Sequence, residues 1–470
     1  MSNARIKHAP MKVALLCLLL LAPTLQSSPP ASALAKSLRR YPYLTDLVKR
    51  HVTVNWATTS SVRSGHVRYG RVSNHCRGRT ATGHERLISV GRLTERQWRA
   101  SLSRLAPGAR YCYRVYGDGV DLLGNRRSPR FFAQLSARTH KPYTFAVLGD
   151  WGAVSSSGTN PDQAAVLQQL ARSDARFVVM TGDTAYPDGT QRNYGDLVQD
   201  GNDTSTVFGP TFWPRVGDSI PSFVPVGNHG LNEALLVNWP ERSAVRSSTG
   251  RYRMERYCCV NGSSPHQYPS VWYAFGAGRA RIYVLDAAWP NGNLGHGDMY
   301  QNDHDAHWRI TSDEYRWLRH DLQTHPRRVS FAFFHFPLYS DNASESSDPW
   351  LNGPRRLEGL LGRYGVDIVF NGHAHIYERN AKQAGESFVS YVTGGGGATL
   401  EPVSGCHSFD AYAIGWSPTK LKGSSCGSAT APTSASQVFH FLLVTVSGTT
   451  VTVAPTDELG RTFDVQTTSF

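Results

Sequence analysis

Seven side chains that can bind metal ions follow short apolar segments of this chain. The apolar segments cover residues 145–148, 177–180, 223–226, 329–334 and 367–370. The side chains that come after them are Asp150, Asp183, Tyr186, Asn228, His335, His373 and His375. Short apolar runs of this kind are typical of β-strands that are covered on both faces. Because α/β sheets bind their ligands outside the carboxyl ends of such strands, we expect the seven side chains to converge on one metal site.

This donor set predicts the kind of metal and the kind of reaction. It offers oxygen and nitrogen donors and no cysteine, which suits ferric iron, Fe(II), Mn or Zn. An aspartate that bridges two further groups of donors implies two metal ions about 3.5 to 4 Å apart. Such a pair acidifies a bound water to hydroxide at neutral pH and neutralises charge on a phosphoryl group. The predicted chemistry is therefore hydrolysis.

Each motif by itself has an ordinary structural interpretation. A Gly-Asp pair after a strand, as at Asp150, is a common turn, and a histidine in an apolar strand, such as His335, is usually a satisfied core residue. Only His373 and His375 are suggestive alone, because alternate positions point two imidazoles the same way. The five motifs together, in this order, predict a metal site.

The residues ahead of these motifs predict a separate β domain. Segments with alternating or β-branched residues lie at 51–56, 65–69, 110–116 and 131–135, separated by turn residues. No helical period occurs between them, which favours an all-β sandwich of roughly a hundred residues. Residues 105–115 resemble the corner between strands E and F of fibronectin type III domains, with a tyrosine available for the corner hydrogen bond.

Strands and helices alternate in the rest of the chain. Helices are predicted at residues 161–173, where Pro161 supplies the first turn, and at 312–323 and 354–364. Residues 437–446 and 450–454 return to a strand pattern around Gly448, which predicts a hairpin within 437–454.

The first 35 residues are predicted to be a secretory signal peptide. They combine a basic start, an apolar run at 13–21 that is too short to span a bilayer, and two overlapping Ala-x-Ala sites. We therefore expect an exported protein without a membrane span after cleavage. The three expected parts are the signal peptide at 1–35, a β-sandwich at 36–138 and a catalytic domain at 139–470.

Charge and cysteines add little about partners. The net charge of +13 suits either a soluble surface or the attraction of anionic substrates, and no nucleic-acid-binding module is evident. Six cysteines remain after the predicted signal peptide. Cys76 with Cys112 and Cys406 with Cys426 would be local pairs, and the adjacent Cys258 and Cys259 have no assigned partner. The sequence gives no disulfide connectivity and no oligomeric state.

The order and types of the motifs resemble the metallophosphoesterases and, within them, the purple acid phosphatases. Tyr186, three positions after Asp183, is the discriminating feature, because most other two-metal phosphoesterases of this fold lack it. Residues 372–379 are similar to the plant-type members, which also place a fibronectin-like domain ahead of the catalytic one. The resemblance implies a catalytic α/β domain of two packed mixed sheets flanked by helices.

The resemblance also implies a role for each candidate residue. The first metal, Fe(III) in the family, would be held by Asp150, Asp183, Tyr186 and His375. Asp183 would bridge to a divalent Fe, Zn or Mn ion that Asn228, His335 and His373 also bind. Charge transfer from Tyr186 to Fe(III) would give the purple colour. His229 would contact the phosphate or assist proton transfer.

One departure from the family leaves the catalytic acid open. Plant-type members carry two histidines about nine residues after the equivalent of His335, whereas residues 339–346 of this chain contain none. The alternatives for the role are His229, Asp341, Glu345 and the histidines at 296, 304 and 307. Asp286, which follows another predicted strand, is expected to give structural support.

Together these features predict a secreted dinuclear-metal phosphatase. It would hydrolyse phosphate monoesters by attack of a metal-held hydroxide, with phosphate acquisition as its purpose. An alternative is a secreted phosphodiesterase or nucleotidase of the same fold that uses Mn or Zn, since esters with better leaving groups need less protonation. An alternative of another class is a cell-wall-binding or adhesion protein, which has no reason to keep all seven ligands.

Overall fold

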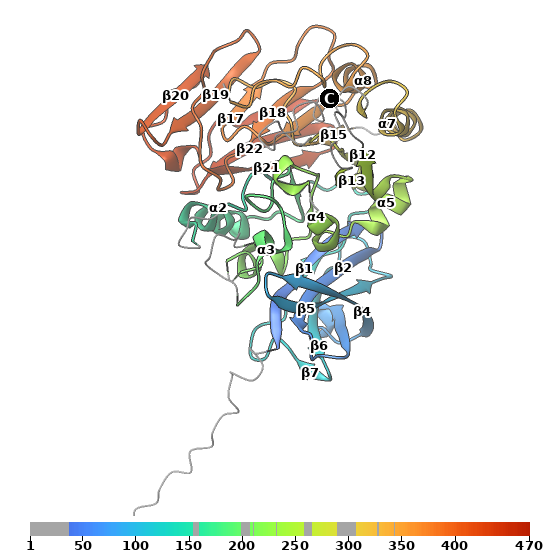
Figure 1. The fold of residues 1–470 in the computed structure, drawn as a ribbon. Coiled ribbons are helices and arrows are strands. Elements are labelled where there is room, and N and C mark those ends of the chain that lie inside the picture. Colours follow the sequence, from blue (N-terminus) through green and yellow to red (C-terminus); the bar gives the residue numbers. More distant parts are fainter. Residues whose placement is uncertain are drawn as a thin grey trace, which may run out of the picture.

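The computed structural model describes most of the chain after the predicted signal peptide. The described residues are 37–153, 159–198, 207–209, 211–231, 233–257, 266–288, 307–326, 329–342 and 344–470. The signal peptide, Cys258, Cys259, His296 and His304 lie outside them. Figure 1 shows a β-rich N-terminal part at one end and a larger α/β part above it.

The N-terminal part consists of strands, as the sequence predicts. They are β1 (Leu38–Val48), β2 (His51–Thr59), β3 (Gly65–Arg71), β4 (Arg79–Val90), β5 (Leu93–Leu102), β6 (Arg110–Gly117), β7 (Val120–Asp121) and β8 (Arg130–Phe132). A short 3-10 turn, η1 (Val72–Asn74), follows β3. The stacked rings of Trp56 and Trp98 lie in the core of the N-terminal part. The hydroxyl of Tyr111 accepts the N–H of Ala106 at 2.9 Å, which is the expected corner hydrogen bond.

Two mixed sheets form the α/β part. In the first, β9 (Tyr143–Leu148), β10 (Val178–Met180) and β11 (Ser222–Phe223) run parallel, and β21 (His440–Ser447), β22 (Thr450–Asp457) and β23 (Gln466–Ser469) complete it. The second has the order β12-β13-β14-β15-β16-β18-β17-β19-β20. Its strands are β12 (Arg251–Tyr257), β13 (His266–Ala277), β14 (Ala280–Val284), β15 (Val329–Phe333), β16 (Ile368–Asn371), β17 (Tyr377–Asn380), β18 (Val389–Thr393), β19 (Asp410–Ser417) and β20 (Lys422–Gly427).

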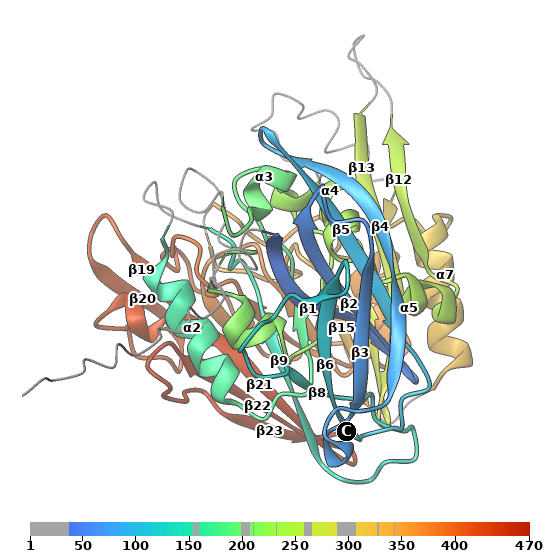
Figure 2. The same ribbon diagram turned by 90° about the horizontal axis from the view of Figure 1, so that it is seen from below.

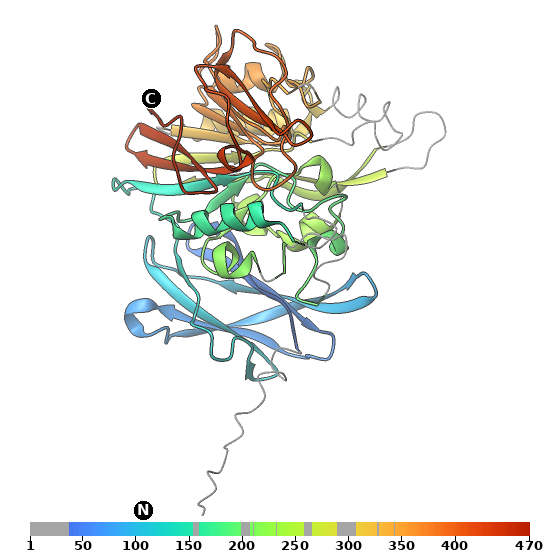
Figure 3. The ribbon, with the colours of Figure 1, turned by 90° about the vertical axis from the view of Figure 1, so that its left-hand side faces the viewer.

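Aromatic side chains fill the space between the two sheets. Phe145 of β9 meets Phe331 of β15 edge to face at 5.4 Å between ring centroids, and Phe223 of β11 stacks on Phe275 of β13 at 4.0 Å. Edge-to-face and stacked pairs stabilise a core beyond the area they bury. Figure 3 shows the resulting layers, with the N-terminal strands below the α/β part.

Helices pack against the α/β part, and some of them lie between it and the N-terminal strands. They are α2 (Pro161–Arg172), α3 (Gln191–Tyr194), α4 (Glu233–Asn238), α5 (Arg242–Ser248), α7 (Asp313–Thr324) and α8 (Leu357–Arg363), with short turns η2 (Trp213–Gly217), η3 (Asn228–Gly230) and η5 (Ala435–Gln437). Figure 2 shows α2 and α7 on opposite sides of the molecule. Asn160 and Ser312 cap the first turns of α2 and α7 by accepting the N–H of Gln163 and Tyr315.

Three details differ from the predicted elements. The strand expected at 223–226 is only Ser222–Phe223, because Pro225 has no N–H for a sheet ladder. The helix expected from residue 354 begins at Leu357. The N-terminal sheet is also continuous with the first catalytic sheet, since β1 pairs in parallel with β11 through Thr45 and Ser222.

Buried polar contacts hold the two parts together. Arg40 of β1 is buried and pairs with Glu95 of β5 at 3.1 Å, and it donates to Asn238 of α4 at 2.8 Å. The carboxylate of Asp46 accepts the N–H groups of Ser243 and Ala244 in the first turn of α5. The N-terminal strands therefore support the α/β part directly.

The two local disulfides are confirmed. Cys76 is bonded to Cys112 and Cys406 to Cys426, with Cα atoms 5.3 Å and 5.4 Å apart. Within the described residues, no helix has the length and apolar character that crossing a bilayer requires.

Candidate metal centre

The seven candidate ligands come from the ends of strands in both sheets. Asp150 follows β9, Asp183 and Tyr186 follow β10, and Asn228 begins η3 after β11. His335 follows β15, and His373 and His375 lie between β16 and β17. Asp150, Asp183 and His335 are buried, and each offers a ligand atom within 4.8 Å of those of the others. The other four are partly exposed, so the centre is open to solvent on one side.

The contacts divide the ligands into two groups. In one, the Nε2 of His335 lies 2.7 Å from the Oδ1 of Asn228 and 3.3 Å from the Oδ2 of Asp183. In the other, the hydroxyl of Tyr186 lies 3.2 Å from both the Oδ1 of Asp150 and the Nε2 of His375.

The imidazole of His373 lies beside the first of these groups. Its ring centroid is 5.1 Å from that of His335. Its backbone N–H donates to both carboxylate oxygens of Asp150, at 3.2 and 3.1 Å, so His373 also links the two groups.

The backbone is strained at three of the seven positions. Asp150, Asp183 and His373 have φ values of 54°, 44° and 73°, in the left-handed region that non-glycine residues rarely adopt. Such strain persists only where the surrounding structure enforces it, and it gathers at functional sites. The strand ends therefore aim these side chains at a cost in local stability.

Glycines beside the ligands permit the close packing of the strand ends. A Cβ on Gly227 would lie 2.2 Å from the Oδ1 of Asp183. Gly182 has a φ of +106°, and a Cβ there would lie 2.4 Å from the Nδ1 of His335. Any larger residue at either position would displace a candidate ligand.

Backbone carbonyls orient two of the imidazoles. The Nδ1 of His335 lies 2.8 Å from the carbonyl oxygen of Thr181, and the Nδ1 of His375 lies 2.7 Å from that of Thr399. A carbonyl oxygen can only accept a hydrogen bond, so Nδ1 is the donor and carries the hydrogen in both residues. The Nε2 atoms, which face the carboxylates, are then free to bind metal in the neutral rings.

The pKa values of three candidate ligands show that the carboxylates of the centre favour positive charge beside them. Burial lowers the pKa of His335, but the carboxylate of Asp183 outweighs it and raises that pKa to about 9. Burial likewise lowers the pKa of His375, and Asp150 raises it to about 10. Burial, with Asp183 and Asp150, raises the pKa of Tyr186 well above its ordinary value. The raised pKa values of the two imidazoles show that the carboxylates beside them favour positive charge. The donor set and its charge thus fit two metal cations.

His229 lies at the edge of the centre. Its ring packs on that of Tyr186 with centroids 4.4 Å apart, and its backbone N–H donates to the Oδ1 of Asp183 at 2.9 Å. Its Nδ1 contacts the carbonyl oxygen of Pro187, which leaves Nε2 as the nitrogen available to a ligand.

The structure separates Glu345 from Asp341, although they share one loop. The carboxyl of Glu345 interacts electrostatically with His375, Asp150 and Tyr186, and its Oε2 is buried without a hydrogen-bond donor among the described residues. Asp341 instead contacts His407 through its Oδ1. Only Glu345 is thereby placed at the metal centre.

His307, the third histidine considered for the acid, has a different partner. Its Nε2 lies 2.6 Å from the Oε2 of Glu314, and both residues are buried. The other carboxylate oxygen of Glu314 accepts the N–H of Asp286 at 2.9 Å. Asp286 thus lies beside His307 and Glu314, and the structural support expected from it stays a prediction.

Sequence reasoning missed Glu401. Its Oε2 accepts the N–H of His375 at 3.2 Å and the side-chain N–H of Asn342 at 2.8 Å, so it links the ligand turn to the loop that carries Glu345. Glu401 follows a glycine-rich stretch with no regular period, so no signal in the sequence marks it.

Comparisons with known proteins agree with this geometry. The model of the calcineurin-like phosphoesterase family matches residues 143–377, which is half of the 470 residues. The model of the purple acid phosphatase N-terminal domain matches residues 41–135.

Curated relatives and a solved structure extend the likeness beyond the matched domains. Purple acid phosphatase 23 of Arabidopsis thaliana is 26% identical over 319 residues, which is 64% of this chain and 62% of that protein. Acid phosphatase type 7 of Mus musculus is 27% identical over 350 residues, covering 70% of this chain and 67% of that one. The yellow lupin purple acid phosphatase PPD1 has the same fold, with a TM-score of 0.64 at 17% identity over 92% of this chain and 74% of that one. This chain belongs to the purple acid phosphatase family of calcineurin-like phosphoesterases.

Proposed function

We propose that this protein is a dinuclear-metal phosphatase that hydrolyses phosphate monoesters. The observation that supports the proposal best is the arrangement of the seven donors. Asp183 lies 3.3 Å from His335 of the first group, and one of its carboxylate oxygens lies within 4.8 Å of one of Asp150, which belongs to the second group. A carboxylate in that position has two oxygens to offer to two cations.

We assign the two cations as Fe(III) with a divalent Fe, Zn or Mn ion. Asp150, Asp183, Tyr186 and His375 would hold the Fe(III), since a phenolate favours that ion. Asp183, Asn228, His335 and His373 would hold the divalent ion. When bound, such a pair lowers the pKa of a coordinated water and neutralises charge on the phosphoryl oxygens.

His229 positions the substrate in this proposal. Its Nδ1 is engaged by the Pro187 carbonyl, so the ring cannot turn freely and its Nε2 stays beside Tyr186. In its imidazolium form, which carries a hydrogen on both ring nitrogens, His229 donates a hydrogen bond from Nε2 to a phosphoryl oxygen. Charge that develops on that oxygen during the displacement strengthens the bond.

Glu345 protonates the leaving group in this proposal. When the phosphorus–oxygen bond breaks, the departing oxygen takes the proton of the Glu345 carboxyl, and the resulting carboxylate recovers a proton from water. Burial raises the pKa of Glu345 to about 9, with Glu401 adding to the effect and His375 opposing it. These surroundings favour the protonated carboxyl, which is the form that can donate a proton.

We also propose that the protein acts outside the cytoplasm, in phosphate acquisition. Two disulfides are typical of proteins from oxidising compartments. A secreted phosphatase releases inorganic phosphate from organic esters that cells cannot take up directly.

A phosphodiesterase that uses Mn or Zn is the second candidate. One observation favours it: residues 339–346 contain no histidine, whereas the resemblance to the plant-type members leads one to expect a pair there for phosphate contact and leaving-group protonation. Diesters with good leaving groups need less protonation.

The two candidates are distinguished by substrate preference. For the metal-loaded protein we expect kcat/KM for p-nitrophenyl phosphate to exceed that for bis(p-nitrophenyl) phosphate by at least about tenfold, because two cations neutralise the dianion better than a monoanion. Both esters release the same phenol, so leaving-group chemistry is matched. A preference for the diester would replace the proposal with the second candidate.

A further inference from the structure

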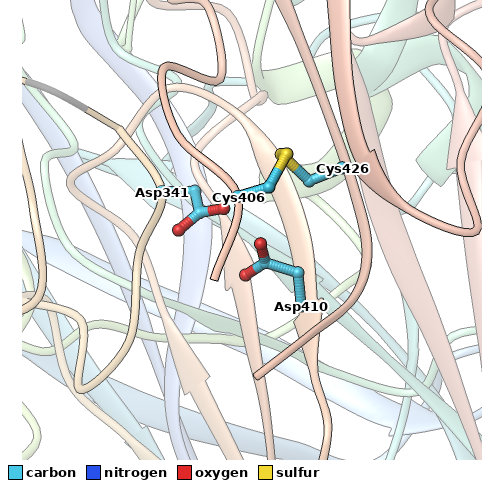
Figure 4. A group of neighbouring side chains, drawn as sticks. All are labelled: Asp341, Cys406, Asp410 and Cys426. Carbon is cyan, nitrogen blue, oxygen red and sulfur yellow. A yellow bond between two sulfur atoms is a disulfide. The ribbon is translucent and has the colours of Figure 1, made fainter. Parts of the chain in front are cut away.

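A second group of carboxylates lies away from the metal centre, beside the Cys406–Cys426 disulfide. Figure 4 shows the side chains of Asp341 and Asp410 close to each other and to this disulfide. One carboxylate oxygen of each lies within 4.8 Å of the other and of both sulfur atoms. Because the cysteines are bonded to each other, their sulfurs are not thiolate ligands.

A third carboxylate, that of Glu378, lies on the same face of the sheet and contacts the backbone of Asp341. Glu378 of β17 is paired with Ala413 of β19, which is paired with Cys426 of β20. Residues opposite each other on neighbouring strands point to the same face of a sheet, so Glu378 lies on the face of the disulfide. Its Oε2 accepts the N–H of Asp341 at 2.9 Å.

The cluster carries more negative charge than its surroundings neutralise. Glu378 is fully buried and Asp341 is 2% exposed. The Oε1 of Glu378, the Oδ2 of Asp341 and the Oδ1 of Asp410 are buried without a hydrogen-bond donor among the described residues. Among the described residues, the one cationic group that interacts with these three carboxylates is the imidazole of His407, which contacts Asp341.

Buried carboxylates require a partner. Leaving one unpaired costs several kcal/mol, so such groups are protonated, ion-paired or bound to a cation. Burial raises the pKa of Asp410 to about 7, with Asp341 adding to the effect, and burial raises that of Glu378 well above its ordinary value. Both shifts show that these surroundings disfavour the charged carboxylates.

We propose that Asp341, Asp410 and Glu378 bind a divalent cation of the Ca²⁺ class. The donors are all oxygens, and they come from a loop, a strand start and a strand interior rather than from one rigid motif. Ca²⁺ accepts irregular oxygen sites, whereas Mg²⁺ requires near-octahedral geometry and keeps its waters. This inference does not depend on the phosphatase activity.

A cation here ties the loop of Glu345 to the second sheet. Asn342 follows Asp341, forms a β-bridge with Val403, and accepts the N–H groups of Ser344 and Glu345 through its side-chain oxygen. Fixing Asp341 against β17 and β19 therefore fixes the start of the turn that presents Glu345.

Equilibrium dialysis of the metal-loaded, full-length protein against radiolabelled Ca²⁺ at ~1 mM tests the site, since extracellular Ca²⁺ modules bind at about 10⁻⁴ to 10⁻³ M. We expect one Ca²⁺ per chain and a rise in Tm of about 1 °C at ~1 mM Ca²⁺. Both effects should be lost in Asp341→Asn/Asp410→Asn. Glu378→Gln provides a second test in case the double variant does not fold. It keeps the shape of the side chain and should lower the affinity for Ca²⁺ at least tenfold.

Two control variants locate the bound ion. Asp313→Asn removes an exposed carboxylate of α7 and should keep the Ca²⁺. Asp183→Asn alters the metal centre and should also keep it, so loss of phosphatase activity and loss of Ca²⁺ are measured separately. A wild-type protein that binds no Ca²⁺ would show that protons neutralise the cluster. Carboxylate variants that bind Ca²⁺ unchanged would show that the ion does not bind at the cluster. Either result would overturn the inference.

Discussion

Asp183→Asn is expected to lower kcat/KM for p-nitrophenyl phosphate by at least about 10³-fold. Changes around metal ligands cost 10 to 100-fold by themselves, and this change removes one of the two charged oxygens of the bridging ligand. The side chain keeps its size, and Asp183 is buried against His335 at 3.3 Å, so the position stays packed. The kinetic loss should therefore come with loss of metal, not of fold.

Metal content and thermal stability complete this test. The variant should hold fewer than two metal ions per chain by mass spectrometry and should still unfold cooperatively. Asp313→Asn, which changes an exposed carboxylate in the same way, should keep both metals and the wild-type rate. An Asp183→Asn protein with two metals and activity within tenfold of wild type would show that Asp183 is not the bridging ligand.

Glu345→Gln is expected to lower kcat by about 10² to 10⁴-fold for an alkyl phosphate, the range that general acids contribute. For p-nitrophenyl phosphate the loss should be at least tenfold smaller, because that leaving group departs without a proton. The amide keeps the shape of the carboxyl but cannot supply the proton. The measurement is kcat for both esters with each protein.

The pH dependence of the rate and the variant His229→Ala distinguish an acid from a phosphate contact. With wild type, the rate on the alkyl ester should fall as pH rises through the pKa of Glu345, because the carboxyl loses the proton that it donates. Glu345→Gln should remove that descending limb. His229→Ala should slow both esters to a similar extent, since a phosphate contact does not distinguish leaving groups. An equal loss on both esters in Glu345→Gln would exclude Glu345 as the acid.

The convergence of the seven candidate ligands could be predicted because each follows a short apolar run that indicates a buried strand. Asp150 comes two residues after the end of β9, and His335 two residues after the end of β15. Parallel strands bring such positions to one edge, whatever the loops between them do. The caps at Asn160 and Ser312 are similarly local, so the helices at α2 and α7 were predicted to within two residues.

Non-local pairing could not be predicted in the same way. Nothing in residues 38–48 indicates that Thr45 pairs with Ser222, because a parallel bridge between distant segments has no local signature. The same holds for Glu401, whose role depends on where the chain returns after β18.

The choice between Asp341 and Glu345 shows where local pattern stops being informative. Both are acids on one loop, four residues apart. The turn at Asn342, held by its bridge to Val403, sends Asp341 toward His407 and Glu345 toward His375. The direction of each side chain thus depends on contacts with distant residues, among them those at 401–407.

The visible absorption spectrum of the purified, iron-loaded protein beside Tyr186→Phe tests the central claim most directly. The hydroxyl of Tyr186 lies 3.2 Å from both Asp150 and His375, so a cation held by those two is within its reach. We predict a broad band between roughly 500 and 600 nm from Tyr186 bound to Fe(III), and its loss in the variant. A colourless wild-type protein that holds two metals and hydrolyses esters, or a band that survives in Tyr186→Phe, would contradict the ferric assignment.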